Sequence, residues 1–238
     1  MKLFLSGYGR MGKMLQDLAE EKGWEVIGWA DITCPERYDT APKADICIDF
    51  SGVGALPRLA EYIRRTKTPL VSGTTGYTEG EFAILKELAE EVPVIWASNY
   101  STGIAVLRRI LRQYAPVLED WDKELIETHH NKKIDAPSGT AKTLLKELDP
   151  QGTATVVHGR EGFCGERSKG EIGVFALRGG SVAGEHSVLF FGQDESLELT
   201  HKASSRRIFA AGALRAAEAL STKTPGYYNL EDLIFTEG

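Results

Sequence analysis

A polar segment near the middle of the chain holds the residues best suited to acid–base chemistry. Residues 122–142 read DKELIETHHNKKIDAPSGTAK, and within them residues 129–133 bring together four basic side chains: His129, His130, Lys132 and Lys133. Histidine exchanges a proton near neutral pH, and lysine adds a positive charge and a second proton. Ser138-Gly139-Thr140 begins a predicted helix running to about Leu148, whose N-terminal amides attract anions. The segment therefore predicts a carboxylate-binding site with proton donors beside it.

Two other interpretations of this segment stay open at this point. Adjacent residues on a strand point to opposite faces, so His129 and His130 are poorly placed to hold one metal ion. Asp135 could join one of them, but no third ligand follows at a familiar spacing. We therefore predict no metal. The second alternative is a solvated basic loop, and Lys132 is expected to be a solvated neighbour of the site.

The first hundred residues predict the sheet that would carry a cofactor. Short apolar strands are expected at residues 2–6, 24–30, 45–50, 69–72 and 93–97. Helices are expected between them, at residues 10–22, 56–65 and 78–91. Alternating strands and helices of this kind indicate a doubly wound, Rossmann-like parallel sheet with helices on both faces, an α/β fold.

Three glycines follow the first strand and open the first helix, in the pattern Gly7-x-Gly9-x-x-Gly12. In the dinucleotide fingerprint the first glycine permits a tight turn, the second lets the backbone approach a pyrophosphate, and the third allows close packing. The same letters also fit an ordinary turn. Asp31 ends the second strand 24 residues after Gly7 and could accept ribose hydroxyls, which favours nucleotide binding.

Asp31 also bears on the choice of cofactor. A carboxylate at this position favours the ribose diol of NADH and repels the additional phosphate of NADPH. Ile32 and Thr33 supply no guanidinium for that phosphate, although Arg10 and Lys13 could partly offset the repulsion. We expect NADH to be preferred and NADPH to be tolerated.

Composition and charge narrow the class of protein. The 238 residues are 42% apolar and 26% charged, which are ordinary globular values. A net charge of −6 argues against a nucleic-acid partner. No segment approaches the roughly 18 apolar residues of a membrane span, so no membrane association is expected. Three cysteines without a C-x-x-C pair are typical of reduced thiols in a cytoplasmic protein.

Beyond residue 150 the pattern changes to consecutive strands. Strands are expected at residues 170–177, 185–191 and 196–202 with no helix between them, which predicts an antiparallel meander in a second α+β domain. The central strand is apolar on both faces, so both faces must be covered. Helices 104–118 and 138–148 could cover one face, and a second copy of the chain the other. We therefore expect a homo-oligomer.

Several segments together resemble one known family. ETHHNKKIDAPSGTA is similar to the signature of the dihydrodipicolinate reductases, enzymes of the diaminopimelate route to lysine. Other similar blocks run nearly end to end: GYGRMGK, DFS, VSGTTG, ASNYSTG, GREG, GEIG, RGG, GEHSV and THKASSRRIFAAGA. The chain departs from the family between Asp31 and Asp45, where the usual glycine-rich connection is shortened.

The resemblance implies roles for individual residues. It makes His129 a proton donor or acceptor and Lys133 a proton donor, and which of them releases the proton stays open. It implies that His130, Gly139 and Thr140 contact the substrate. We also expect Ser138 to contact the substrate, because it belongs to the same helix start. The implied cofactor contacts are Gly7, Tyr8, Gly9, Arg10, Met11, Gly12, Asp31, Gly73, Thr74, Thr75, Ala97, Ser98, Asn99 and Tyr100.

The resemblance also implies an organisation and a reaction. Residues 1–100 with 206–238 would form the nucleotide-binding domain, residues 101–205 the substrate-binding and oligomerisation domain, and four copies a homotetramer. The reaction would be NADH- or NADPH-dependent reduction of 4-hydroxy-tetrahydrodipicolinate, a small dicarboxylate, through its dehydrated cyclic imine to tetrahydrodipicolinate.

Rival functions on a similar sheet explain the sequence less well. A methyltransferase would leave the HHxxK and SGT segment unexplained, and a non-catalytic nucleotide sensor would need no proton donor. A short-chain dehydrogenase is disfavoured because the chain has no Tyr-x-x-x-Lys.

Overall fold

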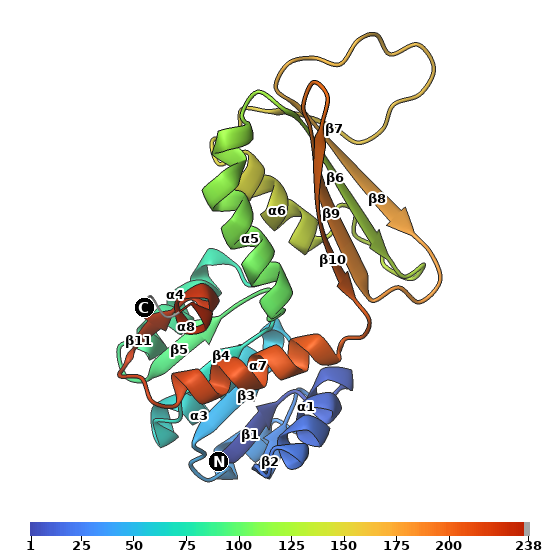
Figure 1. Ribbon diagram of the computed structural model, residues 1–238. Coiled ribbons are helices and arrows are strands. Elements are labelled where there is room, and N and C mark those ends of the chain that lie inside the picture. Colours follow the sequence, from blue (N-terminus) through green and yellow to red (C-terminus); the bar gives the residue numbers. More distant parts are fainter. Residues whose placement is uncertain (236–238) are drawn as a thin grey trace. The chain divides into compact units, whose positions relative to one another are not determined.

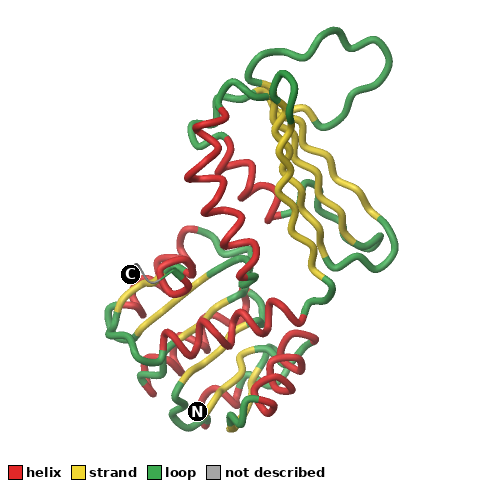
Figure 2. Tube along the Cα trace, in the orientation of Figure 1, coloured by secondary structure: helices red, strands yellow, loops and turns green. Residues whose placement is uncertain are grey.

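The computed structural model describes residues 1–235, and the chain divides into two compact units. Met1–Thr102 and the chain from Arg207 form the first unit, and Gly103–Arg206 forms the second. Residues 236–238, the end of the predicted nucleotide-binding domain, lie outside the described residues. Each unit has its own sheet, drawn as arrows in Figure 1 and in yellow in Figure 2. Among the described residues, no helix combines the length and apolar character needed to cross a membrane.

The first unit is built on a six-stranded sheet in the order β11-β5-β4-β3-β1-β2, and every neighbouring pair is parallel. Its strands are β1 (Lys2–Ser6), β2 (Glu25–Ala30), β3 (Ile46–Asp49), β4 (Leu70–Ser72), β5 (Pro93–Trp96) and β11 (Gly226–Tyr228). Its helices are α1 (Arg10–Glu21), α2 (Glu36–Thr40), η1 (Val53–Ala55), α3 (Leu56–Thr66), α4 (Glu79–Ala89), α7 (Arg207–Leu220) and α8 (Leu230–Ile234). The predicted doubly wound sheet is confirmed. Strand β11, at one edge, and the short helix α2 were not predicted.

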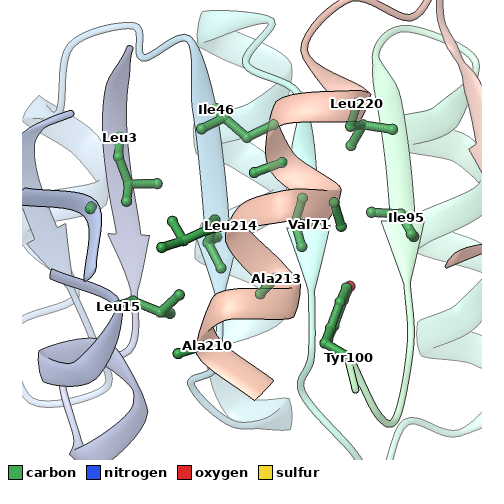
Figure 3. Packing of buried hydrophobic residues seen from close by; sticks show 14 of the residues in the cluster. Leu3, Leu15, Ile46, Val71, Ile95, Tyr100, Ala210, Ala213, Leu214 and Leu220 are labelled. Atoms are coloured by element: carbon green, nitrogen blue, oxygen red, sulfur yellow. The ribbon is translucent and has the colours of Figure 1, made fainter. Parts of the chain in front are cut away.

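Helix α7 packs across one face of this sheet (Figure 3). Ala210, Ala213 and Ala217 of this helix are fully buried, and small side chains let a helix approach a sheet closely. Gly212 shows how close the approach is, because a Cβ there would lie 1.8 Å from the carbonyl oxygen of Tyr100. The helix therefore fixes the loop that follows β5.

The second unit packs two helices on one face of a five-stranded sheet (Figure 1). Its strands are β6 (Asp122–His129), β7 (Thr155–Val157), β8 (Glu171–Arg178), β9 (Gly184–Phe191) and β10 (Ser196–Ala203). Its helices are α5 (Thr102–Tyr114), η2 (Ala115–Leu118) and α6 (Gly139–Leu148). The strand residues Leu125, Val188 and Phe190 are buried in one cluster with the helix residues Leu111 and Leu144. The predicted helical cover of one face is confirmed.

The predicted antiparallel meander is wrong. Strands β9 and β10 form an antiparallel hairpin, but β6 lies between β8 and β9, and β8 runs parallel to both β6 and β7. The sheet is therefore mixed. Turn residues mark where strands end, but they do not determine which strands pair. The β8–β9 connection passes over the end of β6, where the Gly179 amide donates to the His129 carbonyl at 2.9 Å.

Candidate active site

The glycine loop of the first unit is closed on one side and open on the other. Gly7 has a φ of +92°, and a Cβ there would lie 2.6 Å from the Phe50 carbonyl oxygen. A Cβ at Gly12 would lie 2.2 Å from the Gly7 carbonyl oxygen, so both glycines are sterically required. A Cβ at Gly9, which caps α1, would meet no atom within 4 Å. This open side adjoins the switch point between β1 and β3, where doubly wound sheets bind ligands.

Asp31 follows β2 with one carboxylate oxygen already engaged. Thr33 donates to Oδ1 from its amide at 2.8 Å and from its hydroxyl at 2.6 Å. The hydroxyl bond is the largest cause that lowers the pKa of Asp31. Within residues 1–235 all side-chain hydrogen bonds of Asp31 use Oδ1, so Oδ2 remains for an incoming hydroxyl.

Aromatic residues support the same corner of the sheet. The Tyr8 ring stacks on Trp29 with centroids 4.5 Å apart, and the Arg37 guanidinium lies 3.9 Å from the Trp29 ring centroid. The remaining predicted contacts of the loop, Arg10 and Met11, begin α1, with Arg10 exposed and Met11 half-buried. Arg37 and Trp29 were missed in the sequence because neither belongs to a motif.

A buried carboxyl group joins three strand ends beneath the glycine loop. Asp49, at the end of β3, has no solvent exposure and accepts hydrogen bonds from Ser6 of β1 at 2.7 Å and Ser72 of β4 at 2.8 Å. The Ser51 amide also donates to it at 3.2 Å. Sequence reasoning did not select Asp49. The available signal was an acidic residue ending the apolar strand DICIDF.

The other predicted cofactor residues lie in the loops after β4 and β5, at the same edge of the parallel sheet. A Cβ at Gly73 would lie 2.3 Å from the Phe50 ring, so packing requires this glycine. Tyr100 is buried and donates from its hydroxyl to the Ser72 carbonyl at 2.7 Å. The Asn99 side chain accepts from the Ser101 amide at 2.8 Å. The remaining residues in these two loops are Thr74, Thr75, Ala97 and Ser98.

In the second unit, His129 is held by a buried carboxylate. Glu127 lies two residues earlier on β6, has no solvent exposure, and accepts a hydrogen bond from His129 Nδ1. The opposite ring nitrogen, Nε2, lies beside Gly184, where a Cβ would approach it to 3.0 Å. The His186 ring stands edge-on to His129 with centroids 5.2 Å apart.

Arg178 and the start of α6 share the same carboxylate. Arg178 donates to Glu127 Oε1 at 2.8 Å and to Oε2 at 3.0 Å, and the Ser138 amide donates to Oε1 at 3.0 Å. Burial alone would raise the pKa of Glu127, but the hydrogen bonds from Arg178, His129 and Ser138 outweigh it and hold that pKa below its usual value. Glu127 is therefore a charged group inside the unit.

Lys133 and His130 sit in the turn that follows β6. The Lys133 ammonium lies 2.8 Å from Asp135 Oδ1, and this bond is the main cause that lowers the pKa of Asp135. The Arg206 guanidinium lies 3.1 Å from His130 Nε2. Lys132 is exposed. Among the described residues, no group of three or more histidine, cysteine or acidic side chains is arranged to hold a metal ion.

Ser138 is the N-cap of α6, because its hydroxyl accepts from the Ala141 amide at 3.1 Å. The hydroxyl is buried and also lies 3.2 Å from His186 Nε2. Gly139 is exposed with no atom within 4 Å of a Cβ position, and Thr140 is half-buried. An anion can therefore approach the helix start at Gly139 and Thr140, while the Ser138 side chain is engaged in the protein.

His186 lies on β9 and is buried. Its Nδ1 has no hydrogen-bond partner within the described chain. Burial, with a smaller effect from nearby His129, lowers the pKa of His186 to about 4. The ring is therefore neutral at physiological pH.

These features of the two units define a class of protein. An open glycine loop at the switch point of a parallel sheet, followed by an available carboxylate, fits the pyrophosphate and ribose of a dinucleotide. The second unit adds a histidine and a lysine for proton transfer beside an accessible helix N-terminus. The chain has the parts of a nicotinamide-dependent oxidoreductase.

Family comparison identifies the chain more closely. Residues 1–100 match the family described as dihydrodipicolinate reductase, N-terminus, and residues 103–234 match dihydrodipicolinate reductase, C-terminus. The chain belongs to the dihydrodipicolinate reductase family. The resemblance stated from the sequence is thereby confirmed, as is the expectation of a reductase of this family.

Relatives match over nearly the whole chain. The 4-hydroxy-tetrahydrodipicolinate reductase of Staphylococcus haemolyticus is 42% identical and covers 98% of this chain and 100% of its own length. The same enzyme of Akkermansia muciniphila is 44% identical, with coverage of 95% and 94%. A solved dihydrodipicolinate reductase from Paenisporosarcina sp. TG-14, with dipicolinate bound, shares the fold at a TM-score of 0.79, 20% identity and 98% coverage of both chains.

Proposed function

We propose that this chain reduces 4-hydroxy-tetrahydrodipicolinate, through its dehydrated cyclic imine, to tetrahydrodipicolinate with NADH or NADPH. The observation that carries the proposal is that the second unit holds His129 and Lys133 together with the accessible start of α6. The chain that holds them is a member of this family. Relatives that bear this enzyme's name along their full length support it, as does the dipicolinate held by the Paenisporosarcina reductase.

The residues of the second unit suit a substrate with two carboxylates. One carboxylate would bind at the start of α6, at the amides of Gly139 and Thr140, where the helix dipole is positive. The other would bind to the cationic side of the site, at His130 and Lys133. Two separate anion sites would hold the ring in one orientation.

Proton supply is the main chemical task of these residues. The nicotinamide supplies a hydride when it is bound. Hydride addition to a conjugated imine moves negative charge toward the ring nitrogen, and a nearby cation stabilises that charge in the transition state. Lys133 would supply the charge, and His129 and Lys133 are the two donors for the proton that completes the reduction.

The first unit would hold the cofactor and set its preference. The amides at Gly9 and the start of α1 would bind the pyrophosphate, and Asp31 Oδ2 would accept a ribose hydroxyl. We propose a preference for NADH, because an ionised Asp31 repels a ribose phosphate. A ratio of kcat/KM values that favours NADPH strongly would contradict this preference.

The open face of the second sheet supports a homotetramer. Leu177 and Phe191 point away from the helices and are 48% and 42% exposed, and half-buried Ile126, Phe175 and Leu189 lie on the same face. A second copy would cover this apolar surface. Sedimentation velocity at micromolar concentration tests the assembly, and a monomer would contradict it. Unpaired Cys34, Cys47 and Cys164 support a cytoplasmic location.

Loss of the near-ultraviolet absorbance of NADH with freshly made 4-hydroxy-tetrahydrodipicolinate tests the activity. We expect turnover that requires both the substrate and the reduced cofactor. A methyltransferase or a nucleotide sensor would bind its ligand and leave NADH unoxidised, so the absence of turnover by the folded protein would overturn the proposal.

A further inference from the structure

Glu127 is a buried carboxylate whose two oxygens both accept hydrogen bonds. Both oxygens accept two bonds each: His129 Nδ1 and Arg178 on Oε2, and Arg178 and the Ser138 amide on Oε1. A carboxylate has about four lone-pair sites, so its acceptor capacity is filled. These donors come from β6, β8 and the cap of α6.

The carboxylate determines which ring nitrogen of His129 carries the proton. An ionised carboxylate only accepts hydrogen bonds, so the nitrogen that faces it must be protonated. Nδ1 is therefore the protonated nitrogen of the neutral ring, and Nε2 is the nitrogen that gains and loses a proton. Residue 184 is a glycine, and a Cβ at this position would lie 3.0 Å from Nε2. The absence of a side chain at Gly184 therefore leaves space beside Nε2.

The same carboxylate positions the helix start. The Ser138 amide precedes the accessible Gly139, so its bond to Oε1 fixes the anion-binding end of α6 with respect to His129. Arg178 supplies the positive charge that a buried carboxylate needs, and its guanidinium is itself held by the Asp135 carbonyl at 2.7 Å. Removing the charge of Glu127 would disturb the ring and the helix start together.

We propose that Glu127 is a positioning residue, with Arg178 as its counter-ion, that holds His129 with Nδ1 protonated and sets the start of α6 beside it. The inference rests on the proposed reductase function, in which Nε2 of His129 faces the substrate. Glu127 itself touches neither substrate nor cofactor in this proposal.

Glu127→Gln tests the proposal because it keeps the size of the side chain and removes its charge. The matched control is Glu147→Gln on α6, where another largely buried carboxylate accepts from Arg108 and Arg112. We expect kcat of Glu127→Gln to fall about 10- to 100-fold, as for loss of an oriented acid–base group. The KM for NADH should stay within about twofold of wild type, and Glu147→Gln should keep the wild-type kcat.

The pH profile separates positioning from a merely structural role. The His129 ring is bonded to Glu127 of β6, which Arg178 of β8 also contacts, and His186 of β9 stands edge-on to the ring. His186 in turn interacts electrostatically with His201 of β10 and with Lys133 in the turn after β6. Without the carboxylate a charged imidazole loses its hydrogen-bonded partner, so the pH dependence of kcat should move toward lower pH in Glu127→Gln and stay unchanged in Glu147→Gln. A lower kcat with an unmoved profile, or an unchanged kcat, would overturn the proposal.

The nitrogen-15 chemical shifts of the histidine rings provide a test without substrate. His129→Gln identifies the signals of His129. We expect the wild-type protein and Glu147→Gln to show a protonated Nδ1 and an exchanging Nε2, and Glu127→Gln to lose that pattern. A wild-type ring protonated at Nε2 alone would refute the positioning role. Absence of reductase activity with the expected ring pattern would instead refute the proposed function.

Discussion

Protonation of one buried histidine should make the protein sensitive to mild acid. His186 is buried, and its pKa is lowered to about 4 from 6.5, mainly by burial. The unfolded chain therefore takes up a proton near pH 6.5 that the folded chain resists. The stability from neutral His186 is fully present above that value and is lost as the pH falls toward 4. Linkage gives a loss of ~2 kcal/mol by about pH 5, and ~3 kcal/mol in full.

Urea unfolding at about pH 7.5 and about pH 5 measures this loss. His186→Gln keeps an amide that can bond the Ser138 hydroxyl but cannot take up a proton. The free energy of unfolding of this variant should therefore fall by ~2 kcal/mol less than that of the wild type between the two pH values. His158→Gln is the control for removal of a histidine, because His158 is exposed, and it should keep the full fall. Equal pH dependence in wild type and His186→Gln would refute the reasoning, because some other group would then be responsible.

Three further substitutions test the predicted site residues of the two units. Lys133→Ala should lower kcat about 100-fold or more with little effect on the KM for NADH, since it removes a proton donor; a near-wild-type kcat in steady-state assays would contradict the role. Asp31→Ala should weaken NADH about tenfold or more in a fluorescence titration and leave kcat at saturating cofactor unchanged, because it removes charge-assisted hydrogen bonds. Gly12→Ala places a Cβ 2.2 Å from the Gly7 carbonyl, so NADH affinity measured in the same titration should fall by about tenfold, and an unchanged affinity would show that the loop yields.

The first unit was predictable because its sequence signals are local. Each strand is a short apolar run, each helix has its own period, and the glycine loop requires only its neighbours, as the contacts of Gly7 and Gly12 show. The positions of Asp31 and Ser138 were also predictable, since a carboxylate after a strand and a serine before a helix are end signals. Strand β11 is only three residues long and carries too weak a pattern to be recognised.

The second sheet was harder to predict because its pairing is not local. Strands β8, β9 and β10 were recognised and the short strand β7 was not. The pairing was missed because β6 enters between β8 and β9 from more than 40 residues earlier in the chain. The contact between Glu127 and Arg178 was missed for the same reason. They meet only because β6 and β8 are parallel neighbours, and the sequence shows one as an acidic residue in a strand and the other as a turn residue.

Each unit contains a buried acidic side chain at the centre of a hydrogen-bond cluster, and the donors differ between the two clusters. Asp49 is surrounded by hydroxyl and amide donors from three strand ends, whereas Glu127 is matched by the full charge of Arg178. In the role proposed above, Glu127 supports a ring whose charge changes as it gains and loses a proton. A permanent counter-ion keeps Glu127 ionised in both states of that ring, so the geometry that presents Nε2 does not depend on the state of the proton.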